Sequence, residues 1–271
     1  MSNHPHHTPR ATLPNIIRSA LYMAFLIVTV VPYAIFCTLC APLPLSWRYT
    51  ITIGWPKMAL WAARWILGIR YEVIGAEKLP TDAVSPLIIL SKHQSAWETL
   101  FFAARLPRDV VFVYKKELHR VPFFGWGLAL LSMIPIDRKR GREAFSQVVA
   151  IGGQRLREGR WPVLFPEGTR VSPGQVGRYK QGGAILACQT GTPVIPVAHN
   201  AGERWPRQAF IKTPGLVTVS FGPLMDPTGM TPHALNQQVQ EWIETEMQRL
   251  NPERYHNKPP VAGPNPKRDA S

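Results

Sequence analysis

The amino-acid sequence predicts an α/β fold in which a mainly parallel sheet of about seven strands is flanked by helices and preceded by a membrane-embedded helical hairpin. Two observations lead to this prediction. From residue 71 onward, apolar runs of strand length alternate with segments of helical periodicity, which is typical of parallel sheets. Before them, the 29 residues from 19 to 47 include no charged side chain.

The charge-free stretch is long enough to cross a bilayer, which takes about 20 apolar residues. We expect a kink at Pro32 and the end of the helix at Pro42 or Pro44. Residues 51–69 mix three tryptophans with basic side chains, which is typical of a helix at the membrane interface. A buried hairpin of a soluble protein is the alternative, and so long a charge-free run argues against it.

More basic side chains follow the charge-free stretch than precede it, so the positive-inside rule predicts that the rest of the chain lies on the cytoplasmic side. A re-entrant hairpin fits the same charges. The three cysteines do not suggest a disulfide framework, which agrees with a reducing compartment.

Seven apolar runs predict the strands, and the helices follow the second, fourth and fifth of them. Apolar residues at helical spacing over 235–250 predict a last amphipathic helix. We therefore divide the chain into a disordered tail (1–15), an anchoring segment (16–69), an α/β domain (70–250) and a proline-rich disordered tail (251–271). The predicted strands are 71–74, 87–90, 110–114, 133–136, 163–165, 194–197 and 217–221, and the predicted helices are 95–105, 142–157 and 182–189.

The net charge of +14 implies polyanionic partners, such as nucleic acid, anionic lipid headgroups or an acidic carrier protein. None of the common nucleic-acid-binding motifs occurs, so we expect no nucleic-acid partner. No set of cysteines and histidines has the spacing of a zinc site, and we expect no metal.

The first segment that carries chemistry is SKHQSAWE at residues 91–98. A buried strand delivers His93 into a short loop, where ligands bind in open α/β sheets and where an imidazole suits general-base catalysis. Glu98 follows in the first turn of a helix and can hold the tautomer of that imidazole. Ser95 and Glu98 also match a capping box, which is a purely structural alternative for Glu98.

The second segment is FPEGTR at residues 165–170, again at the end of a strand. Gly168 permits close backbone approach, Thr169 offers a hydroxyl, and the planar Arg170 guanidinium suits a phosphate. An ordinary surface turn is the alternative. Lys115 and Arg138 also follow strand ends, at what we expect to be the same edge of the sheet, although a solvated basic face would explain most of the surrounding cations.

These motifs, taken in order, resemble the glycerolipid acyltransferase family, and within it the bacterial 1-acylglycerol-3-phosphate acyltransferases. The resemblance covers about residues 50–225 and rests on His93-x4-Glu98, KKEL at 115–118, IDR at 136–138, FPEGTR at 165–170 and VIPV at 194–197. One departure stands out. The first motif of the family usually reads His-x4-Asp, whereas Glu98 is longer by one methylene.

The resemblance implies direct acyl transfer, from acyl-CoA or acyl carrier protein to the sn-2 hydroxyl of lysophosphatidic acid, without a covalent acyl-enzyme, cofactor or metal. It implies a protein of the bacterial inner membrane whose catalytic domain faces the cytoplasm. His93 would be the general base, Glu98 would orient it, and Glu167 would organise its turn rather than touch the phosphate. The acceptor site that it implies consists of Lys115, Arg138, Glu167, Gly168, Thr169 and Arg170, with Glu167 included as the residue that organises the turn.

Three other functions remain open at the level of sequence. The nearest alternative is an acyltransferase of the same fold that acts on another acceptor, such as a lyso-ornithine lipid or a lipid A precursor. The second is a non-catalytic, membrane-anchored lipid-binding protein, for which His93 would be dispensable. The third is a membrane-tethered nucleic-acid-binding protein, which only the charge supports.

Overall fold

The structure is a computed structural model, and it describes residues 11–82, 84–121, 124–137 and 142–255. All seven predicted strands are present, and their ends differ from the predicted ones by no more than two residues. The strands are β1 (Ile69–Ile74), β2 (Ile88–Ser91), β3 (Val110–Lys115), β4 (Ile134–Ile136), β5 (Trp161–Leu164), β6 (Val194–His199) and β7 (Gly215–Phe221).

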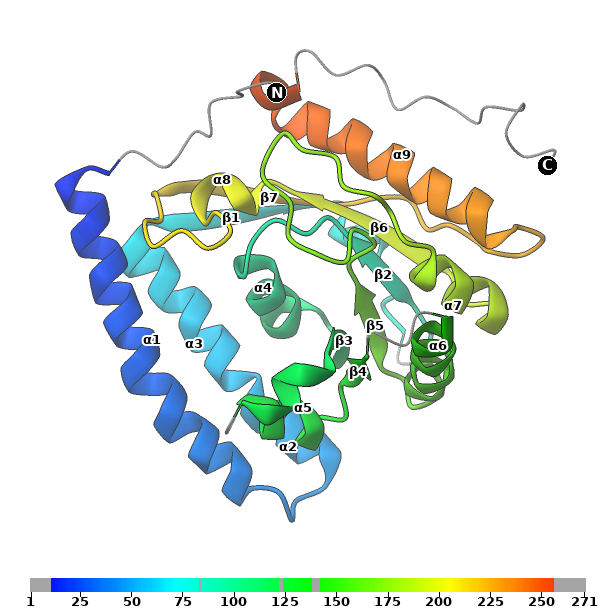
Figure 1. Cartoon of the computed structure of the whole chain (residues 1–271), viewed down its shortest axis with the longest axis horizontal. Coiled ribbons are helices and arrows are strands. Elements are labelled where there is room, and N and C mark those ends of the chain that lie inside the picture. The colour runs from blue at the N-terminus through cyan, green and yellow to red at the C-terminus, as the bar shows by residue number, and fades with distance from the viewer. Residues whose placement is uncertain (1–10, 83, 122–123, 138–141, 256–271) are drawn as a thin grey trace.

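The strands form one sheet in the order β1-β7-β6-β2-β5-β3-β4 (Figure 1). The five strands from β6 to β4 are mutually parallel. β1 and β7 are parallel to each other, and β7 runs antiparallel to β6. The mainly parallel sheet predicted from sequence is therefore confirmed, and the reversed pair at one edge is a detail that the sequence analysis did not contain.

Helices cover both faces of the sheet, on one side α6 (Arg142–Arg157), α7 (Gly182–Thr190) and α9 (Pro232–Leu250) and on the other α3 (Gly54–Ala62) and α4 (Trp97–Arg105) (Figure 1). Every residue of β2, β5 and β6 is buried as a result. Burial on both faces explains why these strands are continuous apolar runs rather than alternating ones. Shorter helices complete the chain: α2 (Leu45–Thr52), α5 (Phe124–Leu130), α8 (Ala201–Arg204) and α10 (Pro252–Tyr255).

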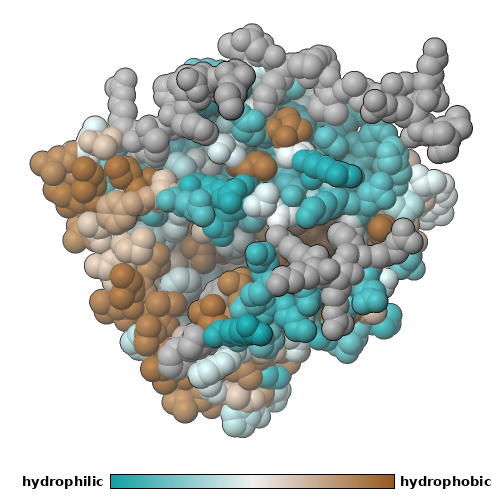
Figure 2. Space-filling model, viewed as in Figure 1, coloured by the Kyte–Doolittle hydropathy of each residue, from teal (hydrophilic) through white to brown (hydrophobic). Residues whose placement is uncertain are grey.

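The N-terminal segment is a helical hairpin in which α1 (Leu13–Leu39) runs beside α3 and its π-helical continuation, Ala63–Leu67 (Figure 1). Pro32 lies inside α1. Within the described ranges, α1 is the one helix long and apolar enough to cross a membrane, and only 11% of its most apolar window is buried. Figure 2 shows the corresponding apolar band, which α1 and the neighbouring helices form along one side of the molecule.

Two predicted boundaries need correction. The first tail was expected to extend to residue 15, but α1 begins at Leu13. Pro14 fits the first turn of α1, because the N–H group that proline lacks would have no partner within the helix there. The last tail was expected from residue 251, but α10 follows α9 directly. It is held because Tyr255 is buried and Arg254 makes a two-pronged ion pair with Glu203. Residues 1–10 and 256–271 lie outside the described part of the chain.

Candidate active site

The sheet brings the two motif segments together because their strands are neighbours. β2 pairs in parallel with β5, so that Leu90 lies opposite Leu164. The loop that follows β2 carries His93, and the turn that follows β5 carries residues 165–170. Both therefore leave the sheet at the same edge, beyond the carboxyl ends of the strands, where open α/β sheets bind their ligands.

The His93 imidazole is fixed on two sides. Its Nδ1 lies 2.8 Å from Oε1 of Glu98. Its ring stacks on the Phe165 ring with the centroids 3.9 Å apart and the planes 17° from parallel. The imidazole is 15% exposed, and no described residue bonds to Nε2. A Glu98 carboxylate that accepts the proton of Nδ1 leaves the lone pair on Nε2, which is the form that a general base needs.

Glu98 is fully buried and uses one oxygen for several bonds. Besides His93, its Oε1 accepts the backbone N–H groups of Gln94 at 3.1 Å and Ser95 at 2.9 Å. Burial raises the pKa of the Glu98 carboxyl, but the neighbouring His199 and His93 and these hydrogen bonds outweigh burial and hold the pKa below its ordinary value. The carboxylate is therefore ionised near neutral pH. Glu98 thus makes one of the two bonds of a capping box, to the backbone N–H of Ser95, together with the bond to His93 that the functional interpretation requires.

Glu167 faces inward, away from any ligand in the turn. Its Oε2 accepts the backbone N–H of His93 at 2.9 Å, and its Oε1 lies 2.6 Å from Nζ of Lys92. Burial raises the pKa of Glu167 above its ordinary value, although the Lys92 ammonium opposes the shift. Glu167 thus organises the histidine loop.

His199, at the end of β6, supports the same loop from the other side. Its Nδ1 accepts the backbone N–H of Ala201 at 3.4 Å, so Nε2 carries the proton and donates to the carbonyl oxygen of Lys92 at 2.8 Å. Burial lowers the pKa of His199, while the Glu98 carboxylate opposes that shift. A neutral His199 therefore fixes the peptide that precedes His93.

The rest of the turn faces solvent. Gly168 has φ +66°, a left-handed conformation that glycine tolerates, and a Cβ there would lie 2.9 Å from Nζ of Lys180. Thr169 is exposed and Arg170 is half-buried. No ion pair or side-chain hydrogen bond joins the Arg170 guanidinium to another described residue, so its five donors are available to a ligand.

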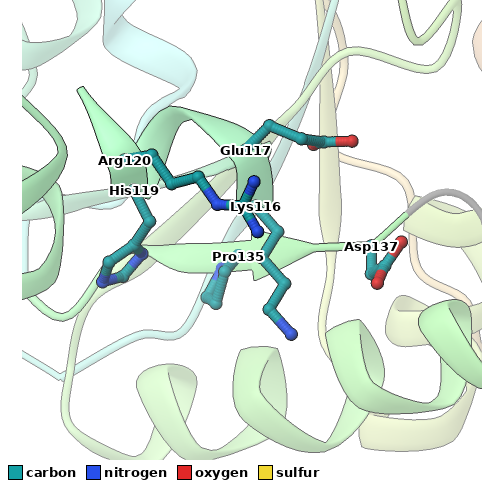
Figure 3. Close-up of a pocket in the computed structure, with 6 residues that line it drawn as sticks. All are labelled: Lys116, Glu117, His119, Arg120, Pro135 and Asp137. Atoms are coloured by element: carbon teal, nitrogen blue, oxygen red, sulfur yellow. The ribbon is translucent and has the colours of Figure 1, made fainter.

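Lys115 ends β3, two strands from His93, and its side chain is exposed at the same edge of the sheet. Beyond it lies a pocket of about 470 Å³, whose wall includes Lys116, Arg120 and Asp137 (Figure 3). No hydrogen bond or ion pair joins the Lys115 side chain to the His93 loop among the described residues. Arg138, the other cation predicted at this edge, lies outside the described part of the chain.

Four site residues were missed by sequence analysis. Phe165 and Lys92 adjoin predicted residues, but nothing local indicates a stacked ring or a buried ammonium. His199 ends a fully buried strand. Glu244, whose Oε1 lies 2.7 Å from Nζ of Lys92, stands on the apolar face of α9, between Ile243 and Met247. For Glu244, the position of a carboxylate within the apolar stripe of a helix was the one signal available from the sequence.

Comparisons with known proteins indicate the family to which this fold and these motifs belong. The family model described as Acyltransferase matches residues 70–200. The chain is 42% identical over 241 residues to 1-acyl-sn-glycerol-3-phosphate acyltransferase of Pseudomonas aeruginosa, which covers 87% of this chain and 92% of that one. It is 31% identical to 1-acyl-sn-glycerol-3-phosphate acyltransferase alpha of Mus musculus, over 65% of this chain and 62% of the mouse protein. The crystal structure of the 1-acyl-sn-glycerophosphate acyltransferase from Thermotoga maritima superposes with a TM-score of 0.72, at 24% identity, over 88% of this chain and 96% of that one.

Proposed function

This chain belongs to the 1-acyl-sn-glycerol-3-phosphate acyltransferase family, and on that premise we propose that it moves a fatty acyl group from a thioester donor to the sn-2 hydroxyl of 1-acylglycerol 3-phosphate, with His93 as the general base. The acceptor is lysophosphatidic acid and the product is phosphatidic acid. The observation that carries the role of His93 is its bond to the buried Glu98, at 2.8 Å, beyond the end of a central parallel strand.

The reaction is a direct transfer. The acceptor hydroxyl attacks the thioester carbonyl carbon while Nε2 of His93 takes its proton, which gives a tetrahedral intermediate and an imidazolium. The intermediate collapses by breaking its carbon–sulfur bond, and the thiolate leaves as a thiol after receiving the proton from His93. Glu98 stabilises the imidazolium through Nδ1 and prevents the ring from rotating. Phe165 limits the ring to one plane.

The acceptor phosphate is held by the turn after β5. The Arg170 guanidinium supplies paired donors, and Thr169 supplies a hydroxyl. Gly168 has no side chain, so the phosphate can approach the backbone of the turn closely. Lys115 adds positive charge along the same edge. The contribution expected of Arg138 stays a prediction, because Arg138 lies outside the described residues. Glu167 contributes only through the histidine loop, because its carboxylate is fully engaged there.

Membrane insertion accounts for the N-terminal hairpin, since both acceptor and product are lipids. The apolar surface of α1 carries large exposed side chains, and Trp61 and Trp65 extend it onto the second arm of the hairpin. We assign the chain to the inner membrane of a bacterium, with the catalytic domain on the cytoplasmic face. There the donor is acyl-CoA or acyl carrier protein, and the net charge of +14 favours either polyanion.

The test is acyl transfer by the detergent-purified protein from labelled acyl thioesters of both kinds to lysophosphatidic acid. General-base catalysis contributes about 100- to 10,000-fold, so we expect His93→Ala to lose activity by that factor. His233→Ala, which changes an exposed histidine at the start of α9, is the matched control and should keep wild-type activity. Equal activity in His93→Ala and the control would remove His93 from the mechanism, and no phosphatidic acid from the wild-type protein would refute the acceptor.

A further inference from the structure

A buried ionic cluster links α9 to the residue that precedes His93. The ammonium of Lys92 is fully buried and lies 2.6 Å from Oε1 of Glu167 and 2.7 Å from Oε1 of Glu244. Its third donor meets the carbonyl oxygen of Gln175 at 3.2 Å. All three N–H bonds of the ammonium are therefore satisfied in different directions, which leaves Lys92 a single position.

Glu244 is itself held in place. The hydroxyl of Tyr179, from the loop between β5 and α7, donates to the same Oε1 of Glu244 at 2.8 Å. The other oxygen, Oε2, is buried without a partner among the described residues. Because an unpartnered carboxylate oxygen costs free energy on burial, stability alone does not explain a glutamate on the apolar face of α9.

The cluster reaches the active site through Glu167. One oxygen of that carboxylate binds Lys92, and the other binds the backbone N–H of His93. The carbonyl oxygen of His93 in turn accepts the N–H of Val171, in the loop that carries Tyr179. A shift of the Lys92 ammonium would therefore act on the N–H contact of His93 through Glu167.

We propose that Glu244 is a positioning residue for acyl transfer: through Lys92 and Glu167 it sets the backbone of His93, so that Nε2 points at the acceptor hydroxyl. This inference rests on the proposed function. Glu244 lies 152 residues from Lys92 along the chain and outside residues 70–200, which the family model matches. The site thus includes a part of α9 that none of the motifs contains.

Two conservative variants distinguish the effect of the position of the Glu244 carboxylate from the effect of its charge. Glu244→Gln keeps an oxygen at the same reach and loses the charge, whereas Glu244→Asp keeps the charge and withdraws it by about 1.5 Å. We expect Glu244→Gln to keep kcat within about threefold of wild type. We expect Glu244→Asp to lower kcat by about 10- to 100-fold with both KM values unchanged, because small misplacements of a catalytic group cost that much. Glu241→Asp, on the exposed face of α9, is the matched control.

Two results would overturn the proposal: wild-type kcat in Glu244→Asp, or a larger loss in Glu244→Gln than in Glu244→Asp. If Glu244→Asp does not fold, Tyr179→Phe replaces it, since it removes only the hydroxyl that holds Glu244. There we expect a several-fold loss of kcat at unchanged KM, and an unchanged kcat would refute the proposal.

Amide hydrogen exchange gives a readout that needs no substrate. In Glu244→Asp we expect faster exchange in the segment 91–97, which contains the His93 N–H, and wild-type exchange in β7. Uniform acceleration over both segments would mean a loss of stability alone and would refute the positioning role. Because formation of phosphatidic acid by the wild-type protein tests the proposed function separately, the two ideas fail by different measurements.

Discussion

At the scale of single residues, one oxygen atom decides how His93, the proposed general base, is held. Oε1 of Glu98 accepts bonds from the His93 ring and from two backbone N–H groups of the same loop. The loop therefore wraps around the carboxylate that serves its histidine. A carboxylate of this reach fits the loop as it stands, although an aspartate is usual in the family that the sequence resembles.

We expect Glu98→Asp to lower kcat, although this substitution creates the more usual His-x4-Asp motif. Shortening the side chain withdraws the carboxylate by about 1.5 Å from three donors at once, and such a displacement costs about 10- to 100-fold in rate. Steady-state kinetics of Glu98→Asp beside Glu241→Asp would measure it. Unchanged kcat in Glu98→Asp would show that the loop follows the carboxylate inward.

Arg170 is expected to act on acceptor binding. Its guanidinium has no partner among the described residues, and hydrogen bonds to charged groups contribute about 1.5–3 kcal/mol. Arg170→Ala should therefore raise KM for lysophosphatidic acid by about 10- to 100-fold, with a smaller effect for a monoacylglycerol, which has no phosphate. Arg178→Ala, an exposed arginine of the following loop, is the control. An equal effect on both acceptors would argue against a phosphate contact.

At the scale of elements, the sequence predicts strands well because their signal is local. β2, β5 and β6 are short apolar runs bounded by polar residues, and burial on both faces makes each run continuous. The direction of β7 carries no such signal. Its antiparallel pairing with β6 depends on how α8 and the following loop return the chain, which periodicity does not record.

The candidate site divides in the same way. The pair of His93 and Glu98 was predictable because the two residues are five positions apart, in a loop and in the first turn of the helix that follows it. The pairing of Lys92 with Glu244 was not, since it depends on α9 packing back onto β6. Glu167 was expected to organise its own turn, whereas its carboxylate binds Lys92 and the backbone N–H of His93, partners that only the fold reveals.

The turn after β5 predicts a difference between two left-handed glycines. Gly168 and Gly159 both have positive φ, so an alanine at either should cost about 1–2 kcal/mol of backbone strain. A Cβ at Gly159 meets nothing within 4 Å, but one at Gly168 displaces Lys180 beside the turn. We expect similar losses of thermal midpoint for Gly159→Ala and Gly168→Ala, and a raised acceptor KM only for Gly168→Ala. A raised KM in both variants would contradict the role of this turn.

At the scale of the whole molecule, the hairpin is part of the folded domain as well as an apolar surface. Tyr22 of α1 is fully buried, donates to the carbonyl oxygen of Ala59 and packs edge-on against Trp205. Ser19 accepts the backbone N–H of Lys212 at 2.9 Å. These contacts join the apolar band of Figure 2 to α3 and to the segment between α8 and β7. They set the orientation of the band relative to the edge of the sheet at which the proposed site lies.

Stability of the whole molecule should fall on the acid side of neutrality because of His199. Burial lowers its pKa, so the folded state binds the proton less readily than the unfolded chain, whose histidines titrate near about 6.5. The unfolded state then holds more protons below that pH, and stability falls as pH decreases until the folded pKa is passed. Glu98, whose pKa is lowered, contributes its stability above the ordinary glutamate value and loses it only at more acidic pH.

His199→Gln tests this dependence, because the amide cannot titrate and still reaches the carbonyl oxygen of Lys92. The groups that act on His199 are Glu98, His93 and Lys92, and all three remain in the variant. We expect the thermal midpoint of the wild-type protein to fall more between pH 7.5 and pH 5.5 than that of His199→Gln, while His233→Gln follows the wild type. Parallel curves for wild type and His199→Gln would mean that the folded state binds the His199 proton as readily as the unfolded chain does, and would contradict the lowered pKa of this buried imidazole.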